Sequence, residues 1–167
     1  MKIGRIIRII TNVLFILLTV LIAVMYLPIV AGYKSYRVLS ASMEPEYPVG
    51  SLVYVKQIDE SEISKGDVIT FYINESTLVT HRVIEKASDD NGFITKGDAN
   101  NVNDGGVVAY SSIVGKAVFD VPLLGYVSSV MCSLYGKCIV IGSLLLITSL
   151  ELLSNWFERM NCRKVLQ

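Results

Sequence analysis

Two serines and a histidine are the residues of this chain whose chemistry stands out first. Residues 40–45 read SASMEP, which places hydroxyl groups at Ser40 and Ser42. A serine hydroxyl is a poor nucleophile at neutral pH, so it needs a base within hydrogen-bonding reach and a third group that orients the base. His81 is the one histidine in 167 residues. The sequence therefore offers a single imidazole base, although a lone histidine on a strand is more often structural than catalytic.

Two carboxylates that follow the histidine are candidates for the third group. Residues 95–105 read TKGDANNVNDG and contain Asp98 and Asp104. A carboxylate on one imidazole nitrogen fixes the tautomer and stabilises the cation that forms when the other nitrogen takes the serine proton. A solvated loop rich in Asp and Asn is the alternative interpretation of the same segment.

The elements that must position these residues read as short β-strands. Alternating or β-branched segments are separated by clusters of Asn, Asp, Ser and Gly, and no long amphipathic helix lies between them. Alternation on one segment places His81 on the same face as Val79 and Val83. The pattern predicts a mainly β domain, a compact antiparallel sheet or barrel of about 90 residues. The segments are residues 51–56, 67–73, 78–85, 92–96 and 113–119.

A long apolar run precedes this β region. Residues 9–31 carry no charged side chain, and as a helix they would rise about 34 Å, enough to cross a hydrocarbon core of about 30 Å. The run is longer than the apolar part of a signal peptide and lacks a clear small-x-small cleavage site. We therefore expect a retained transmembrane signal anchor, with a buried core helix as the alternative.

A second apolar run follows the β region. Residues 138–150 read CIVIGSLLLITSL and are uncharged, but as a helix they would rise only about 20 Å. Leu152, Leu153 and the interfacial Trp156 extend the run. We expect a second transmembrane helix over residues 136–156, and a monotopic or core helix is the alternative.

Charge placement predicts the orientation of both helices. Six of the fifteen basic residues lie before the first run or after the second, whereas residues 32–137 hold nine Lys and Arg against thirteen Asp and Glu, a formal charge of −4. Because positive charge is retained in the cytoplasm, residues 1–8 and 157–167 are expected there, and residues 32–135 form an extracytoplasmic domain.

The same composition excludes several classes of function. The acidic middle has no basic stripe, so nucleic acid is not an expected partner. Residues 32–131 contain no cysteine, and the chain offers neither a Cys-x-x-Cys pair nor a second histidine. We therefore expect no metal and no other cofactor.

Three boxes in order resemble the type I signal peptidases, in their endoplasmic-reticulum-type branch. SASMEP at residues 40–45 is similar to S-G-S-M-x-P, and THRV at residues 80–83 is similar to the box that holds the general base. TKGDAN at residues 95–100, with Asp104 after it, resembles the T-K-G-D-N-N box and its following acid. The resemblance covers about residues 38–121 and the anchor before them. It includes GSLV at residues 50–53 and KGDVI at residues 65–69.

The resemblance implies a role for each candidate. Ser42 would be the nucleophile, and His81 the general base, in the place where ordinary bacterial relatives have a lysine. Asp104 is favoured as the acid that orients the histidine, and Asp98 is the second candidate, with a supporting role in the loop or in the electrostatics. The Ser42 backbone N–H and the Ser40 hydroxyl would stabilise the oxyanion.

Two positions depart from the family pattern, and two other readings stay open. Ala41 replaces a glycine and Ala99 an asparagine, and alanine disfavours positive φ. A LexA-type serine–lysine peptidase would need a lysine at position 81, whereas Lys86 and Lys96 lie elsewhere in the pattern. A catalytically inactive homologue or a non-enzymatic membrane assembly factor is the alternative from another class.

The resemblance implies a membrane-anchored serine endopeptidase that removes signal peptides from exported preproteins after small residues, as in Ala-x-Ala. Its partners would be signal-peptide-bearing preproteins and the lipid bilayer, and a contact with the secretion translocase is left open. The expected location is the plasma membrane, or the endoplasmic reticulum membrane in a eukaryote. Met43 and residues 78–83 are candidates for lining the substrate subsites, and residues 121–127 are either a membrane-contacting lip or the approach to the second helix.

Overall fold

The structure is a computed structural model that describes residues 2–87 and 91–165, and the chain divides into two compact units. Pro28–Ser128 forms one unit, and the flanking parts of the chain form the other. The candidate residues between Ser40 and Asp104 all belong to Pro28–Ser128. The geometry of the site therefore depends on this unit alone.

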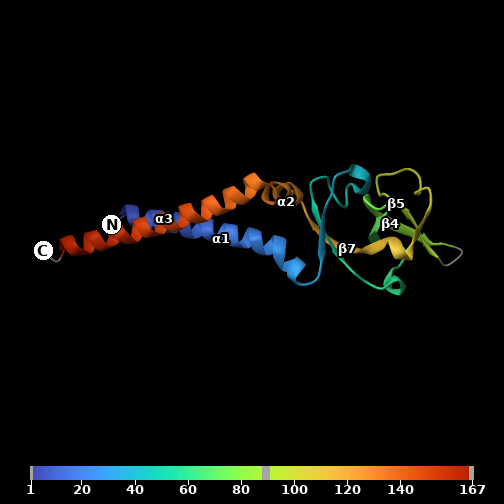
Figure 1. The fold of residues 1–167 in the computed structure, drawn as a ribbon, viewed down its shortest axis with the longest axis horizontal. Coiled ribbons are helices and arrows are strands. Elements are labelled where there is room, and N and C mark those ends of the chain that lie inside the picture. Colours follow the sequence, from blue (N-terminus) through green and yellow to red (C-terminus); the bar gives the residue numbers. More distant parts are fainter. Residues whose placement is uncertain (1, 88–90, 166–167) are drawn as a thin grey trace. The chain divides into compact units, whose positions relative to one another are not determined.

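In the described part of Pro28–Ser128, a seven-stranded antiparallel sheet forms the framework (Figure 1). Its strand order is β1-β2-β7-β3-β4-β5-β6, so the long β7 strand returns to the middle of the sheet and joins its two halves. Bulges interrupt the register between β2 and β7, β3 and β7, and β4 and β5. The strands are β1 (Lys34–Arg37), β2 (Leu52–Lys56), β3 (Val68–Tyr72), β4 (Leu78–Lys86), β5 (Gly92–Lys96), β6 (Val107–Ala109) and β7 (Ile113–Val121).

The mainly β fold predicted from the sequence is confirmed, and the five predicted strands correspond to β2, β3, β4, β5 and β7. The sequence pattern missed β1 and β6. Both are short and lie at the two ends of the sheet order. An edge strand has one partner strand only, so a few residues of weak alternation suffice to form it.

Two apolar clusters cover opposite faces of the β3–β4 pair. Because side chains alternate along a strand, Val68 joins one cluster while its neighbour Ile69 joins the other. Each fully buried apolar side chain contributes roughly 1.5–3 kcal/mol to folding. The first cluster consists of Met43, Tyr47, Val53, Val55, Val68 and Ala117. The second cluster consists of Ile63, Ile69, Phe71, Val83, Phe93 and Val108.

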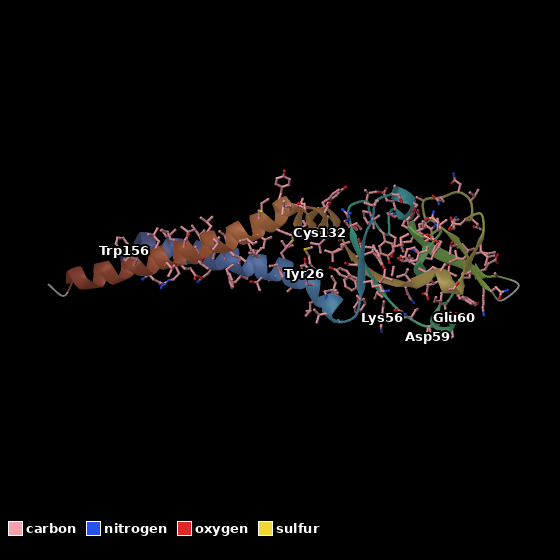
Figure 2. All side chains as sticks on the ribbon, viewed as in Figure 1. Tyr26, Lys56, Asp59, Glu60, Cys132 and Trp156 are labelled. Atoms are coloured by element: carbon pink, nitrogen blue, oxygen red, sulfur yellow. The ribbon has the colours of Figure 1, made fainter. Side chains whose placement is uncertain are left out.

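Three α-helices complete the fold over the residues that the structure describes: α1 (Lys2–Val30), α2 (Leu124–Cys132) and α3 (Leu134–Val165). By length and composition, Arg5–Val30 and Leu134–Trp156 are apolar enough to cross a membrane, with mean hydropathies of 2.9 and 1.8. Figure 2 shows side chains projecting outward along both long helices, with Trp156 labelled on α3. An apolar helix thus lies at each end of the chain, as the sequence predicts, and membrane crossing itself remains a prediction. Residues 124–127 belong to α2.

Candidate active site

The strand β4 fixes the position of His81. His81 pairs in register with Ile69 of β3 and is 8% exposed, on the face that also carries the buried Val83. Its imidazole meets the Phe71 ring edge to face, with 6.4 Å between ring centroids. A packed imidazole on a central strand has little rotational freedom, so its two ring nitrogens point in fixed directions.

Ser42 lies in a short 3-10 helix, Ala41–Met43, that the first cluster holds in place. Met43 is buried in that cluster at 2% exposure, and the Ser42 carbonyl accepts a hydrogen bond from the Ala99 N–H at 2.9 Å. The Ser42 Oγ lies 3.1 Å from the His81 Nε2. The structure therefore brings the two residues, which are far apart in the chain, within hydrogen-bonding reach.

Asp104 lies on the other side of the imidazole. Its Oδ2 is 2.6 Å from the His81 Nδ1, a short contact of the kind that charge-assisted hydrogen bonds make. The same Oδ2 accepts a hydrogen bond from the Thr95 hydroxyl at 2.6 Å, and the Asp104 N–H donates to the Thr95 carbonyl at 2.8 Å. Thr95 is completely buried. Thr95 thus holds Asp104 at two points, and Asp104 holds the imidazole.

Asp98 has a different partner, although it is the other candidate from the same segment. Both of its carboxylate oxygens accept hydrogen bonds from Arg82, at 2.8 Å from Nε and 2.5 Å from Nη2. Arg82 also donates from Nη1 to the Gly66 carbonyl at 2.8 Å. The hydrogen bonds to Asp98 raise the pKa of Arg82, although burial acts in the opposite direction. The pair ties the loop after β5 to β4 next to His81.

Gly97 is a position where only hydrogen fits. A Cβ at this residue would lie 2.6 Å from the Ser42 carbonyl oxygen and 3.0 Å from the His81 Nε2. The loop that contains Gly97 therefore packs directly against the serine and the histidine, and its backbone forms one wall of the site.

Ser40 lies beside the nucleophile candidate, with 3.3 Å between the two hydroxyl oxygens. The two departures from the family pattern cause no backbone strain. Among the non-glycine residues that the structure describes, only Leu123 has a positive φ, so Ala41 and Ala99 adopt ordinary conformations. The Ala99 contact uses only its backbone N–H, which any residue other than proline could supply.

A cavity of about 340 Å³ opens beside Ser42, and we call it the Ser42 cavity. Residues 36–40 and Leu78–His81 line two of its sides, and Met43, Tyr47 and Val53 of the first cluster form its apolar base. Burial chiefly raises the pKa of Tyr47 above its ordinary value, and the neighbouring acidic residues add to the shift. The cavity is thus apolar at its base, with the two serine hydroxyls and the imidazole at its edge.

Within residues 2–87 and 91–165, no group of three or more His, Cys, Asp or Glu side chains is placed to hold a metal ion. The chemistry that the site offers is proton transfer and nucleophilic attack. An Nε2 that accepts the Ser42 proton and an Nδ1 that donates to Asp104 match the geometry of a serine nucleophile with its oriented base.

Three residues of the site were not predicted from the sequence: Thr95, Arg82 and Gly97. All three stand inside the boxes that carry the family resemblance. The signal was therefore present in the sequence, but a threonine, an arginine and a glycine have many structural uses. Only their contacts with Asp104, Asp98 and the nucleophile segment show what they do.

Comparisons with known proteins point to one family. A family model described as "Signal peptidase, peptidase S26" matches residues 9–90, a stretch that contains Ser42 and His81 but ends before Asp104. Signal peptidase I W of Bacillus subtilis (strain 168) is 41% identical over 120 residues, which is 64% of this chain and 63% of the relative.

Two eukaryotic proteins are also similar. The human signal peptidase complex catalytic subunit SEC11C is 34% identical over 105 residues, which is 56% of this chain and 55% of that protein. The signal peptidase complex catalytic subunit SEC11 of Scheffersomyces stipitis is 31% identical over 125 residues, 68% of this chain and 75% of that protein. The match therefore spans less than two thirds of the Bacillus and human relatives and three quarters of the yeast one.

Proposed function

We propose that this chain, which belongs to the signal peptidase family, peptidase S26, is a membrane-anchored serine endopeptidase that removes signal peptides from exported preproteins. One observation carries the proposal: the hydrogen-bonded series from Ser42 Oγ through the His81 imidazole to Asp104. The series is built from a packed strand, a 3-10 helix and a loop, so three separate parts of the fold support it.

In the acylation half of the reaction, the Ser42 Oγ attacks the scissile carbonyl while its proton passes to the His81 Nε2. The Oγ–C bond forms, and the carbonyl electrons move to oxygen. The imidazolium then gives its proton to the leaving amide nitrogen as the C–N bond breaks. Asp104 accepts the Nδ1–H hydrogen bond throughout and stabilises the positive imidazole.

In the deacylation half, a water molecule takes the place of the departed amine. His81 removes a proton from this water as its oxygen attacks the Ser42 ester. The ester C–O bond then breaks, and the proton returns to the Ser42 Oγ. The signal peptide leaves with a new carboxylate, and the enzyme returns to its starting state.

The negative oxygen of each tetrahedral intermediate needs hydrogen-bond donors. Two groups near the Ser42 Oγ support this role: the Ser42 backbone N–H and the Ser40 hydroxyl, whose oxygen is 3.3 Å away. Removal of one such donor typically lowers kcat by about 10²–10³-fold. The paired serines of residues 40–45 thus have separate functions in this proposal.

The edge of β4 supports binding of an extended peptide. β3 pairs with β4 from Leu78 to Arg82, whereas β5 pairs with β4 only from Arg82 onward. In the part of the chain that the structure describes, the second edge of Leu78–His81 thus has no partner strand, and it lines the Ser42 cavity. A substrate strand can add to such an edge through backbone hydrogen bonds. Its carbonyl before the cut then faces Ser42, and its small side chains enter the Ser42 cavity.

The two long apolar helices support the membrane part of the proposal. Both termini are cytoplasmic, and residues 32–135 lie on the extracytoplasmic side, as the distribution of Lys and Arg indicates. A preprotein is held in the same bilayer by its own apolar segment. Restriction of enzyme and substrate to one surface raises their effective concentration and orients the scissile bond.

The test uses the full chain, purified and reconstituted in liposomes with a preprotein that carries an Ala-x-Ala site. Wild type is compared with Ser42→Ala, His81→Ala and the matched control Ser61→Ala, which changes an exposed serine in the 3-10 helix Glu60–Glu62. Product termini are read by mass spectrometry, and folding is checked by circular dichroism. We expect cleavage after the second alanine by wild type and the control only.

Substrate positions are numbered backward from the cut, so the residue directly before it is −1. Replacement of the −1 alanine by leucine should abolish cleavage, because the proposal assigns small side chains to the Ser42 cavity. Equal cleavage by folded Ser42→Ala and wild type would contradict the mechanism. If folded wild type leaves several preproteins uncut, an inactive homologue or a membrane assembly factor becomes the better description.

A further inference from the structure

A second cavity, of about 610 Å³, lies against the candidate catalytic residues, and the proposed mechanism does not use it. We call it the Asp104 cavity. Its base is formed by Phe71 and Val108 of the second cluster, and the exposed Ile73 and Val107 stand at its rim. The two cavities share Val79 and His81. The imidazole is thus a wall of both.

The two cavities lie on opposite faces of the β3–β4 pair. The Ser42 cavity has Met43, Tyr47 and Val53 of the first cluster as its base, and the Asp104 cavity contains members of the second cluster. The alternation of side chains along β3 separates the two clusters, as for Val68 and Ile69. A peptide strand that adds to the edge of Leu78–His81 therefore sends successive side chains to different cavities.

The position of Ser42 decides which side chain enters which cavity. Ser40, Ser42 and Met43 line the Ser42 cavity, so the residue whose carbonyl is attacked, at −1, places its side chain there. From that point the open edge of β4 extends only toward Leu78, because β5 occupies the edge from Arg82 onward. The residues before the cut run along this edge, and alternation returns the −3 side chain to the Ser42 cavity. The −2 side chain points to the face of Val79, where the Asp104 cavity lies.

We propose that the Asp104 cavity binds the side chain at −2 of the substrate and selects large apolar residues there. The inference rests on the proposed peptidase function and adds a specificity determinant to it. The walls are mainly apolar, and Asp104 is the one carboxylate among the described lining residues, which include no lysine or arginine. An acidic side chain at −2 would face this carboxylate without a counter-ion, so the cavity selects against it.

The kinetic test compares preproteins that differ only at −2, as Leu, Ala or Glu, with Ala kept at −1 and −3. Wild type should cleave the Leu substrate at least about tenfold more efficiently than the Glu substrate by kcat/KM, since a single methylene group in a hydrophobic pocket is already worth about 10–200-fold. Val107→Lys, at a rim position that is 50% exposed, should reduce this ratio at least about threefold by favouring Glu.

The matched control is Val102→Lys, at a position that is 74% exposed and outside the lining of both cavities. It should leave the Leu-to-Glu ratio unchanged. If Val107→Lys instead alters the side-chain preference at +1, the residue directly after the cut, or at no position, the assignment of the Asp104 cavity to the −2 side chain is overturned. Wild-type cleavage with the −1 alanine requirement intact would then show that the peptidase proposal stands and that only this inference is wrong.

A binding readout that needs no turnover completes the test. A signal peptide with a photoreactive benzophenone side chain at −2 is cross-linked to the full-length Ser42→Ala variant, and the adduct is mapped by mass spectrometry. We expect adducts at Ile73, Tyr72 or Val107, and a benzophenone at −3 should instead label residues 36–39. Adducts of the −2 probe confined to residues 36–39 would overturn the proposal even if every protein variant were inactive.

Discussion

Replacement of each of the two aspartates by asparagine tests the site in the most discriminating way. Asp104→Asn keeps the size of the side chain but removes the negative charge that faces the His81 Nδ1 at 2.6 Å. The amide can also present its NH₂ group to the ring and so favour the wrong tautomer. Asp98→Asn makes the same chemical change at a carboxylate that contacts Arg82.

The expected size of the effect follows from the geometry. Two unit charges about 4 Å apart interact by about 4 kcal/mol at an effective dielectric constant near 20, which suits a pair whose side chains are 11% and 25% exposed. Loss of this stabilisation from the imidazolium-forming transition state lowers the cleavage rate by about 10³-fold. Asp98→Asn should cost about 1–2 kcal/mol of folding stability through the weaker pair with Arg82, and change the rate by less than about tenfold.

The assay is single-turnover cleavage of a preprotein in liposomes, with enzyme in excess so that the chemical step is observed. Thermal unfolding by circular dichroism measures stability on the same samples. A folded Asp98→Asn variant with a 10³-fold loss beside an active Asp104→Asn variant would refute the assignment, because the pairing of His81 with Asp104 would then be irrelevant to catalysis.

Three further predictions concern the supports of the site. Gly97→Ala should lower the cleavage rate at least about tenfold, because its Cβ would lie 2.6 Å from the Ser42 carbonyl oxygen and 3.0 Å from the His81 Nε2. The cleavage rate of the folded variant measures this effect. Thr95→Val should lower kcat about three- to tenfold, because it removes the hydroxyl that donates to Asp104. Thr95→Ser keeps a hydroxyl and should therefore have nearly the wild-type kcat in the same kinetic assay. Burial opposes ionisation of Asp67, but hydrogen bonds from Lys116 and a backbone N–H outweigh it and lower the Asp67 pKa. A carboxylate whose pKa is lower in the folded state than in the unfolded chain stabilises the fold at pH values above its ordinary pKa of about 4. This stabilisation is lost as the pH falls through the folded-state pKa. Thermal unfolding should therefore show Asp67→Asn less stable than wild type at pH 7, by up to about 1 kcal/mol for a partly exposed pair, and the difference should shrink by pH 3.

The sequence predicted most of the sheet because its inner strands carry strong patterns. Residues 113–119 and 51–56 are rich in β-branched or alternating apolar residues, and they form β7 and β2. β1 reads KSYR and β6 reads VVA, and neither has the length or alternation that marks a strand. Their formation depends on pairing with β2 and β5, which is tertiary information.

The residues of the candidate site could be predicted from the sequence, but their contacts could not. The residue types and the family boxes pointed to Ser42, His81, Asp98 and Asp104, yet spacing could not separate the two aspartates. The fold separates them because β5 pairs Lys96 with Arg82, which places Asp98 beside Arg82. The Asp104 N–H returns to Thr95 and places its carboxylate against the imidazole.

The Asp104 cavity could not be predicted from any local pattern in the sequence. Its base combines residues of β3 and β6, which are far apart in the chain and meet only through the order of the strands in the sheet. Of the exposed apolar residues at its rim, Ile73 ends the predicted strand 67–73, and Val107 lies in β6, which the sequence pattern missed. Substrate selection at −2 could therefore be inferred only once both faces of β4 were known.

The role of Ser42 as nucleophile is tested by the first-order rate constant for cleavage of a membrane-inserted preprotein by wild type, Ser42→Ala and Ser61→Ala under single-turnover conditions. We expect equal rates for wild type and Ser61→Ala and a loss of at least about 10⁴-fold for Ser42→Ala, with an unchanged circular dichroism spectrum. A Ser42→Ala rate within tenfold of wild type would show that the hydroxyl 3.1 Å from His81 is not the nucleophile.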